Sequence, residues 1–221
     1  MQSDLLKEYK NYLTSYQAQR VYNQNTNQEH KVARAVISGD SIAGLFRPHL
    51  LQSYLRPFNI INTGVGGDTS DLFLTRLQED VLQYQPRVVI LSIGGNDLLR
   101  RRCLDGILQR VDQILTVIHN ARPDLPVLLT SVPPVYEKRL NSIILFFNLQ
   151  MQYRVQNHPN VYYIDLWSRL SDPKTARLQE RYWIELPGLR VDSVHFNAEG
   201  YRQWADLLKP WLVRFKAGPA S

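Results

Sequence analysis

Five short apolar runs, separated by longer stretches with helical spacing, constrain the fold of this chain more than any other feature. The runs are VARAVIS (32–38), FNIIN (58–62), RVVILSI (87–93), PVLLTSV (126–132) and VYYIDL (161–166). Continuous apolar runs rich in valine and isoleucine are typical of strands that are buried on both faces. Because helical patterns separate the runs, the sequence predicts an α/β protein with a parallel sheet covered by helices on both sides.

The helical patterns define the rest of the domain. Helices are expected near residues 42–55, 69–84, 104–121, 139–157 and 198–215. Before the first strand, Tyr9, Tyr12 and Tyr16 recur at helical spacing beside leucines, which predicts an amphipathic N-terminal helix. The polar segment NQNTNQEHK (23–31) then predicts a linker. We therefore expect residues 1–30 to form a helix and linker, and residues 31–221 to form a single domain.

Composition excludes several classes of protein. The only cysteine, Cys103, excludes an internal disulfide framework and zinc sites built from cysteine clusters. Residues 1–20 contain no continuous apolar core of a signal peptide, and no stretch approaches the ~18 apolar residues of a membrane span. We therefore expect a cytoplasmic protein without stable membrane insertion. The net charge of +6 is spread along the chain, which indicates a solvated surface and no nucleic-acid partner.

Small polar residues and glycines follow the predicted strands. Open parallel sheets bind ligands at the carboxyl ends of their strands, so these residues are candidates for a functional site. The first strand ends in Gly39, Asp40 and Ser41, and the later segments are NTGVGGDT (62–69), GGND (94–97) and DSVHFNAEGY (192–201). The sequence therefore predicts a site at one edge of the sheet.

Ser41 is a candidate nucleophile if a base lies beside it, because serine is a weak nucleophile at its own pKa. His195 follows the last strand on the same side of the sheet as Ser41, whereas the other histidines are poorly placed: His30, His49, His119 and His158. Asp192 lies three residues before His195, a spacing that on a helical turn brings its carboxylate to the imidazole Nδ1. The alternative is a surface turn in which Asp192 only caps the chain.

Gly67 and Asn96 are candidate donors to an oxyanion. The backbone N–H of Gly67 is not shielded by a Cβ atom, and Asn96 offers a side-chain N–H at the end of the third strand. The alternatives are a tight turn for the glycines and a capping role for Asn96. A nucleotide loop is poorly supported, because GVGG (64–67) lacks the G-x-G-x-x-G spacing.

Four segments in order, ISGDSI (37–42), NTGVGGDT, IGGND (93–97) and DSVHFNAEGY, resemble the blocks of the GDSL-type SGNH hydrolase family over residues 30–210. The resemblance implies a flavodoxin-like three-layer α/β/α fold and acyl-ester hydrolysis without a metal or other cofactor. By position it implies a nucleophile at Ser41, a base at His195, an acidic partner at Asp192, and oxyanion donors at Gly67, Asn96 and the Ser41 N–H.

Two positions depart from the family pattern. Ser193 follows Asp192, where the family frequently has glycine, and three arginines follow the GGNDLL segment: Arg100, Arg101 and Arg102. Neither departure touches a predicted catalytic group, but whether one of the arginines contacts the substrate stays open.

The leading hypothesis is a serine esterase of the lipase/acylhydrolase type that acts on small or lipid-like acyl esters. An alternative is a carbohydrate O-acetylesterase, which would prefer acetyl and leave long acyl chains intact. A third hypothesis, from another class, is a catalytically silent lipid- or nucleic-acid-binding protein. The natural substrate, the acyl chain length and the oligomeric state stay open.

Overall fold

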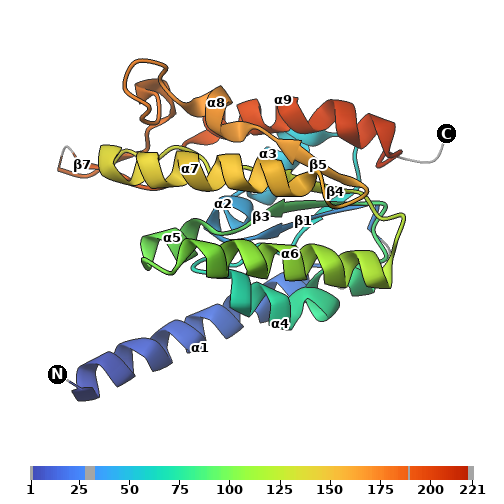
Figure 1. Ribbon diagram of the computed structural model, residues 1–221, viewed down its shortest axis with the longest axis horizontal. Helices are drawn as coiled ribbons and strands as arrows, with labels where there is room; N and C mark the ends of the chain where they lie inside the picture. Colours follow the sequence, from blue (N-terminus) through green and yellow to red (C-terminus); the bar gives the residue numbers. More distant parts are fainter. Residues whose placement is uncertain (1, 28–32, 189, 219–221) are drawn as a thin grey trace.

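A five-stranded parallel sheet forms the centre of the protein in the computed structural model, which describes residues 2–27, 33–188 and 190–218 (Figure 1). Its strand order, β2-β1-β3-β4-β5, is that of the flavodoxin-like fold and confirms the predicted architecture. Each of the five predicted runs supplies one strand: β1 (Ala35–Gly39), β2 (Ile60–Asn62), β3 (Val88–Ser92), β4 (Val127–Thr130) and β5 (Val161–Ile164).

Helices connect the strands, as the periodicity predicts. They are α1 (Gln2–Thr26), α2 (Ser41–Gly44), α3 (Pro48–Leu55), α4 (Ser70–Asp80), α5 (Gly95–Leu99), α6 (Leu104–Ala121), α7 (Lys138–Val155), α8 (Leu166–Leu170) and α9 (Ala198–Arg214), with 3-10 turns η1 (Leu82–Tyr84) and η2 (Glu180–Tyr182). A two-stranded hairpin, β6 (Glu185–Leu186) with β7 (Arg190–Val191), precedes α9. No helix in the described ranges is long and apolar enough to span a bilayer.

The expected helix over residues 42–55 is wrong in one respect, because the structure divides it into α2 and α3. The break has a local cause: Pro48 lacks a backbone N–H and is accommodated at the first turn of a helix, so it begins α3 instead of continuing α2. This arrangement leaves Ser41 at the start of a helix of only four residues.

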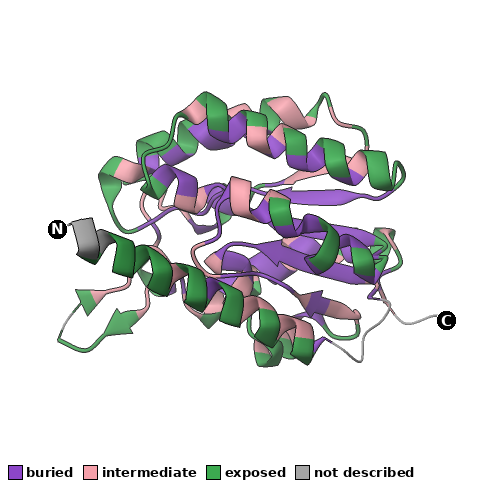
Figure 2. Ribbon diagram, turned by 90° about the horizontal axis from the view of Figure 1, so that it is seen from below, coloured by how far each residue is buried: buried purple, intermediate pink, exposed green. Residues whose placement is uncertain are grey.

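Side chains alternate across the strands and create a core on each face of the sheet. Val36, Val89 and Leu129 pack into the cluster beneath α4, α6 and α7. Ile37, Ile90 and Leu128 point the other way, into the cluster that includes side chains of α3, α8 and α9. Figure 2 shows the buried sheet between the two helical layers. All four strand pairs are parallel, so the carboxyl ends of the strands lie at a single edge.

The N-terminal helix α1 differs from the prediction in both length and packing. It continues to Thr26, so residues 23–26 are helical where a linker is expected; residues 28–32, which include His30, lie outside the described part of the chain. Its apolar residues Leu6 and Tyr9 are 55% and 57% exposed, and Figure 2 shows α1 mainly in the colour of exposed residues. Leu6 and Tyr9 therefore do not attach α1 to the domain, whereas Tyr16, which is 6% exposed, faces it as the predicted spacing requires.

Candidate active site

Ser41 follows β1 after one intervening residue, Asp40, and begins α2 at the carboxyl edge of the sheet. The chain turns there at Gly39, whose φ of +129° favours glycine. A Cβ atom on Gly39 would lie 1.7 Å from the carbonyl oxygen of Ser92 on the neighbouring strand β3. Ser41 thus lies at the carboxyl ends of the neighbouring strands β1 and β3. The chain leaves β1 toward one side of the sheet and β3 toward the other, and flavodoxin-like folds bind ligands at such a point.

Asp40 caps the turn that presents Ser41. Its carboxylate is buried and accepts a hydrogen bond from the Ile42 N–H at 3.0 Å. Burial raises the pKa of Asp40 to about 7, and the nearby carboxylates of Asp68 and Asp97 act in the same direction. The residue before Ser41 therefore carries a carboxyl group that binds a proton more tightly than an exposed aspartate does.

The structure brings Ser41, His195 and Asp192 together in one chain of hydrogen bonds. The Nε2 of His195 lies 2.9 Å from the Oγ of Ser41, and its Nδ1 lies 3.0 Å from Oδ2 of Asp192. Ser41 comes from the start of the domain, whereas the other two residues lie in the segment between β7 and α9. The sequence prediction that these three side chains meet is thus matched by the geometry.

The local reason for the Asp192–His195 contact differs from the expected helical turn. The chain forms a bend there, and the Oδ1 of Asp192 accepts the backbone N–H groups of Val194 and His195, both at 2.9 Å. Partial burial acts to raise the pKa of Asp192, but these hydrogen bonds and the one to the imidazole outweigh it, so the pKa is below its usual range. Asp192 therefore both caps the bend and orients His195.

Gly67 and Asn96 flank the same edge of the sheet. Gly67 has a φ of +78°, and a side chain on it would collide with the ring of Tyr12. One N–H of the Asn96 carboxamide is donated to the carbonyl of Asp68 at 2.9 Å, which fixes the direction of the other. Among the described residues, no acceptor bonds the backbone N–H of Gly67 or of Ser41. These two backbone N–H groups and the second side-chain N–H of Asn96 are therefore donors without a partner among the described residues.

A buried ion pair behind the Gly64–Asp68 loop was not foreseen from the sequence. Arg76 of α4 lies 2.7 Å from Asp68, and both side chains are fully buried. The same guanidinium donates to the carbonyls of Gly39 and Thr63 at 3.0 and 2.9 Å. Arg76 thus connects the end of β1 to the loop that carries Gly67. The sequence shows only an arginine within a predicted helix, and this does not identify the residues that it contacts.

The remaining histidines take no part in the contacts of Ser41 within the described chain. His49 of α3 lines the larger cavity at the site without bonding Ser41, and His119 lies in the last turn of α6. His158 lies 3.2 Å from Asp112, near the opposite edge of the sheet. His195 is therefore the base candidate that the geometry retains.

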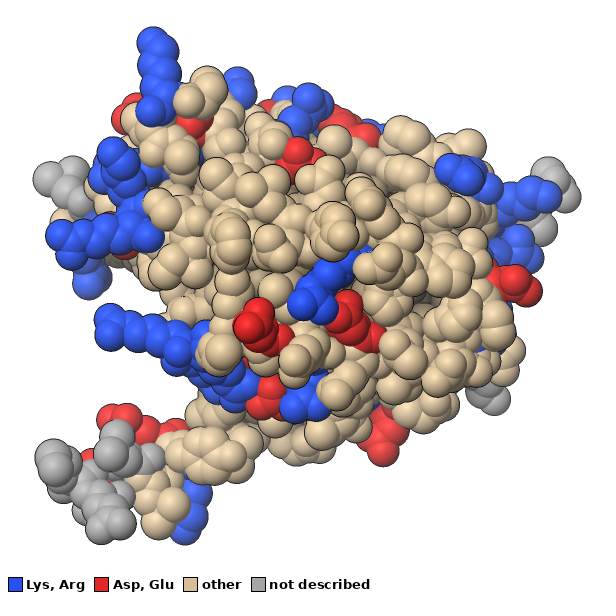
Figure 3. Space-filling model, viewed as in Figure 1, with Lys and Arg blue, Asp and Glu red and all other residues tan. Residues whose placement is uncertain are grey.

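The three arginines after α5 have separate surroundings. Arg100 stacks over the Tyr12 ring at 4.8 Å and donates to the Gly67 carbonyl at 3.3 Å. Arg102 forms ion pairs with Asp71 and Asp97, whereas Arg101 is exposed with a φ of 55°. The arginine run thus touches the Gly67 loop through Arg100. Elsewhere the charges are scattered: on the face in Figure 3, basic side chains stand mainly near the rim, with acidic ones among them.

Two cavities meet at Ser41. The larger, of about 980 Å³, extends between α1, α3 and β2, and the described residues that line it include arginines but no acidic side chain. The smaller, of about 30 Å³, is an apolar slot between α5, α7 and the segment after β4, with Leu98, Ile143 and Val194 among its walls. We call them the polar trough and the apolar slot. Within the described residues, no three histidine, cysteine or acidic side chains cluster as a metal site would require.

A serine bonded to a histidine that is itself bonded to an aspartate, at the carboxyl edge of a flavodoxin-like sheet, is an arrangement found in serine hydrolases. The sequence matches the GDSL-like Lipase/Acylhydrolase family over residues 18–203. It is 32% identical, over 187 residues and 81% of each chain, to thioesterase 1/protease 1/lysophospholipase L1 of Escherichia coli strain K12. The chain therefore belongs to the GDSL-like lipase/acylhydrolase family and is a carboxylic ester hydrolase of the GDSL type.

Two further comparisons agree with this assignment. An arylesterase of Vibrio mimicus is 27% identical over 174 residues, which cover 77% of this chain and 74% of the relative. A solved structure from Streptococcus pneumonia superposes with a TM-score of 0.81 at 21% identity, covering 95% of this chain and 99% of the other. The structural match supports the fold, and the sequence matches support the family.

Proposed function

We propose that this protein is a serine esterase that hydrolyses acyl esters with Ser41 as nucleophile, His195 as general base and Asp192 as the residue that orients the imidazole. The observation that carries the proposal is the continuous chain of contacts from Asp192 Oδ2 to His195 Nδ1 and from His195 Nε2 to Ser41 Oγ, at 3.0 and 2.9 Å. Both distances lie within the range over which a proton moves between a nucleophile and its base.

The reaction follows from this geometry in two stages. Ser41 Oγ attacks the acyl carbon while its proton passes to Nε2 of His195, and the negatively charged Asp192 stabilises the imidazolium. When the tetrahedral intermediate collapses, His195 protonates the leaving alcohol and an acyl group remains on Ser41. Water then attacks this acyl-enzyme, His195 again accepts the proton, and the acid is released as His195 returns the proton to Ser41.

The negative charge on the tetrahedral oxygen requires donors that are already in place. We assign this role to the backbone N–H of Gly67, the second side-chain N–H of Asn96 and the backbone N–H of Ser41. The Asn96 carboxamide is held at one N–H by Asp68, so its other N–H needs no reorganisation when the charge develops. Substitution of Gly67 can act only by distorting the loop, because its donor belongs to the main chain.

The two cavities suggest how an ester would be divided at Ser41. We assign the acyl group to the apolar slot, whose walls are largely aliphatic, and the alcohol to the polar trough. The slot has room for a short acyl group, and a longer chain would leave it over the exposed side chains of Leu99 and Ile143, which are 39% and 53% exposed. This assignment supports an acylhydrolase for small or lipid-like esters.

The difference in size between the cavities also favours a second candidate, a carbohydrate O-acetylesterase. A slot of about 30 Å³ suits acetyl, and a trough of about 980 Å³ with asparagine and glutamine in its lining suits a large polar alcohol. A series of p-nitrophenyl esters from acetate to palmitate separates the two. A steep fall in kcat/KM beyond butyrate supports the acetylesterase, and sustained activity on longer chains supports the acylhydrolase.

Covalent labelling tests the proposed nucleophile directly. A fluorophosphonate should modify Ser41, and Ser41→Ala should abolish both labelling and ester hydrolysis without changing the circular dichroism spectrum. Labelling of another serine would contradict the proposal. A folded protein that neither reacts with the label nor hydrolyses any ester in the series would contradict the proposed catalytic roles and favour the alternative of a catalytically silent lipid- or nucleic-acid-binding protein.

A further inference from the structure

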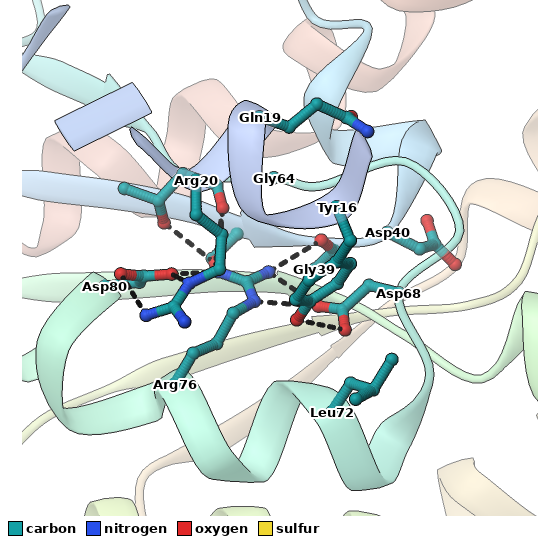
Figure 4. A network of polar contacts seen from close by, with 12 residues as sticks. Tyr16, Gln19, Arg20, Gly39, Asp40, Gly64, Asp68, Leu72, Arg76 and Asp80 are labelled. Atoms are coloured by element: carbon teal, nitrogen blue, oxygen red, sulfur yellow. Dashed lines mark hydrogen bonds and ion pairs between the residues drawn. The ribbon is translucent and has the colours of Figure 1, made fainter. Parts of the chain in front are cut away.

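One face of α1 consists of residues that bond the loop carrying Gly67. The positions are three or four residues apart, so they lie on a single stripe of the helix: Tyr12, Tyr16, Gln19, Asn23. Figure 4 shows part of this contact, with Tyr16 directed at Asp68 and Gln19 beside the loop. The stripe is polar or aromatic at every position, and it is how α1 contacts this part of the domain.

The four side chains reach nearly the whole loop from Gly64 to Asp68. The hydroxyl of Tyr12 donates to the Gly67 carbonyl at 2.8 Å, and that of Tyr16 donates to Asp68 at 3.0 Å. The carboxamide oxygen of Gln19 accepts the Gly66 N–H at 2.8 Å. Asn23 donates to the Gly64 carbonyl at 2.9 Å.

Two of these hydrogen bonds are made by the peptides immediately before and after the one that bears the proposed oxyanion donor. The Gly67 N–H belongs to the peptide between Gly66 and Gly67. Gln19 holds the preceding peptide through the Gly66 N–H, and Tyr12 holds the following one through the Gly67 carbonyl. Glycines have no side chain to restrict rotation, so the peptide between them would otherwise turn easily.

The side chain of Tyr12 is itself fixed. Its ring packs over the position where a Cβ of Gly67 would lie, at 2.9 Å, and Arg100, the residue after α5, stacks on it. On the other side of the loop, Asp68 is anchored by both Tyr16 and the buried Arg76. The loop is therefore clamped between α1 and α4.

We propose that α1 is a positioning element of the oxyanion hole, in which Tyr12 and Gln19 hold the peptides on both sides of the Gly66–Gly67 peptide so that its N–H faces the tetrahedral oxygen. This inference rests on the proposed serine esterase function. Tyr12 and Gln19 are positioning residues, because they act through the loop and not on the reacting atoms. It follows that the helix before the first strand belongs to the catalytic apparatus of this chain.

The test combines Tyr12→Phe with Gln19→Met, which removes both bonds while keeping the size of the side chains. The rate of p-nitrophenyl acetate hydrolysis is measured per active site titrated with fluorophosphonate, so that unfolded protein does not count. Loss of an oxyanion donor lowers kcat by ~10²- to 10³-fold, and a donor that is present but free to turn should cost at least about tenfold. KM should change little.

A second readout separates positioning from general stability. Phenylboronic acid forms a tetrahedral adduct with the serine and places an anionic oxygen in the oxyanion hole, so its affinity should fall in parallel with kcat. Gln19→Glu keeps an acceptor for the Gly66 N–H and should recover most of the rate lost in Gln19→Met. Tyr9→Phe is the matched control, because this exposed tyrosine lies on α1 and its hydroxyl bonds no described residue.

Each outcome bears on one hypothesis. If Ser41→Ala stays active in the same assay, the proposed function fails. If Ser41→Ala is inactive, but the Tyr12→Phe/Gln19→Met enzyme keeps kcat and boronate affinity within twofold of Tyr9→Phe, the positioning role is wrong. A loss confined to KM or to the number of titratable sites would also overturn it, and would make α1 only a cavity wall or a stabilising helix.

Discussion

Replacing Asn96 with alanine should slow catalysis far more than it destabilises the protein. The carboxamide has two N–H groups with different tasks in the structure. One is donated to the Asp68 carbonyl at 2.9 Å, and the other is available to the tetrahedral oxygen in the proposed mechanism. The alanine variant loses both, so its effects on folding and on rate can be calculated separately.

The bond to Asp68 is an ordinary neutral hydrogen bond, whose loss costs ~1 kcal/mol of folding free energy. For a chain of this size, that corresponds to a fall in Tm of roughly 2–4 °C. The second N–H acts only when charge develops, and its loss should cost ~3–4 kcal/mol in the transition state. We therefore expect kcat to fall by ~10²- to 10³-fold with an almost unchanged KM.

The assay is steady-state hydrolysis of p-nitrophenyl acetate together with thermal unfolding followed by circular dichroism. Asn160→Gly provides the control: this asparagine also donates its carboxamide to a backbone carbonyl, at 3.1 Å, but it precedes β5 at the opposite edge of the sheet. The control should lose some stability and no activity. An Asn96→Ala enzyme that loses stability but keeps its kcat would show that Asn96 only forms the turn.

Three other substitutions test the surroundings of Ser41. Asp192→Asn should lower kcat by ~10⁴-fold, measured with the same ester, because the imidazole loses the partner that fixes its tautomer. Burial raises the pKa of Asp40 to about 7, so the folded state gains a contribution from this group that is complete below about pH 4 and is lost as the pH rises through 7. In the wild-type protein, the free energy of unfolding should therefore decrease by on the order of 4 kcal/mol between these pH values because of Asp40. Asp40→Asn should lack this decrease, as measured by urea unfolding at each pH. Arg76→Met leaves Asp68 buried without its ionic partner, although the Tyr16 hydroxyl still donates to it, and should lower the free energy of unfolding by ~3–5 kcal/mol. A loss below ~1 kcal/mol would contradict the stabilising role of the contacts that Arg76 makes between β1 and the loop.

The sequence predicts the sheet and the candidate site well for one physical reason. Strands buried on both faces leave uninterrupted apolar runs, and the residues just after them must lie at one edge. Ser41, Gly67 and Asn96 follow consecutive strands, and His195 follows the last one, so their proximity can be inferred before any contact is known. The spacing of Asp192 and His195 predicts a contact across a helical turn, yet the contact forms in a bend that Asp192 itself caps.

The supporting contacts could not be predicted in the same way. The partners of Arg76 lie on β1 and on the Gly64–Asp68 loop, and charge alone does not choose among the acidic residues of the chain. Tyr12 and Gln19 form a regular stripe in the sequence, but the leucines beside them indicate an apolar face instead. Which face of a helix packs on the domain depends on the surface that it contacts. The Gly64–Asp68 loop presents mainly backbone N–H and carbonyl groups to α1, so the polar face of the helix packs there.

The way α1 is attached determines how it would come loose. Its contacts with the Gly64–Asp68 loop are mainly hydrogen bonds, so detaching it exposes little apolar surface, and such an opening has a small dependence on urea and a small heat-capacity change. Amide exchange in α1 should then vary little with urea at concentrations that weaken the sheet. The hydrogen bonds that α1 gives up are replaced by hydrogen bonds to water, so the enthalpy of this opening is small as well. A detachment of α1 that leaves the core folded would thus escape a urea titration of the whole protein and be detected by amide exchange within the helix.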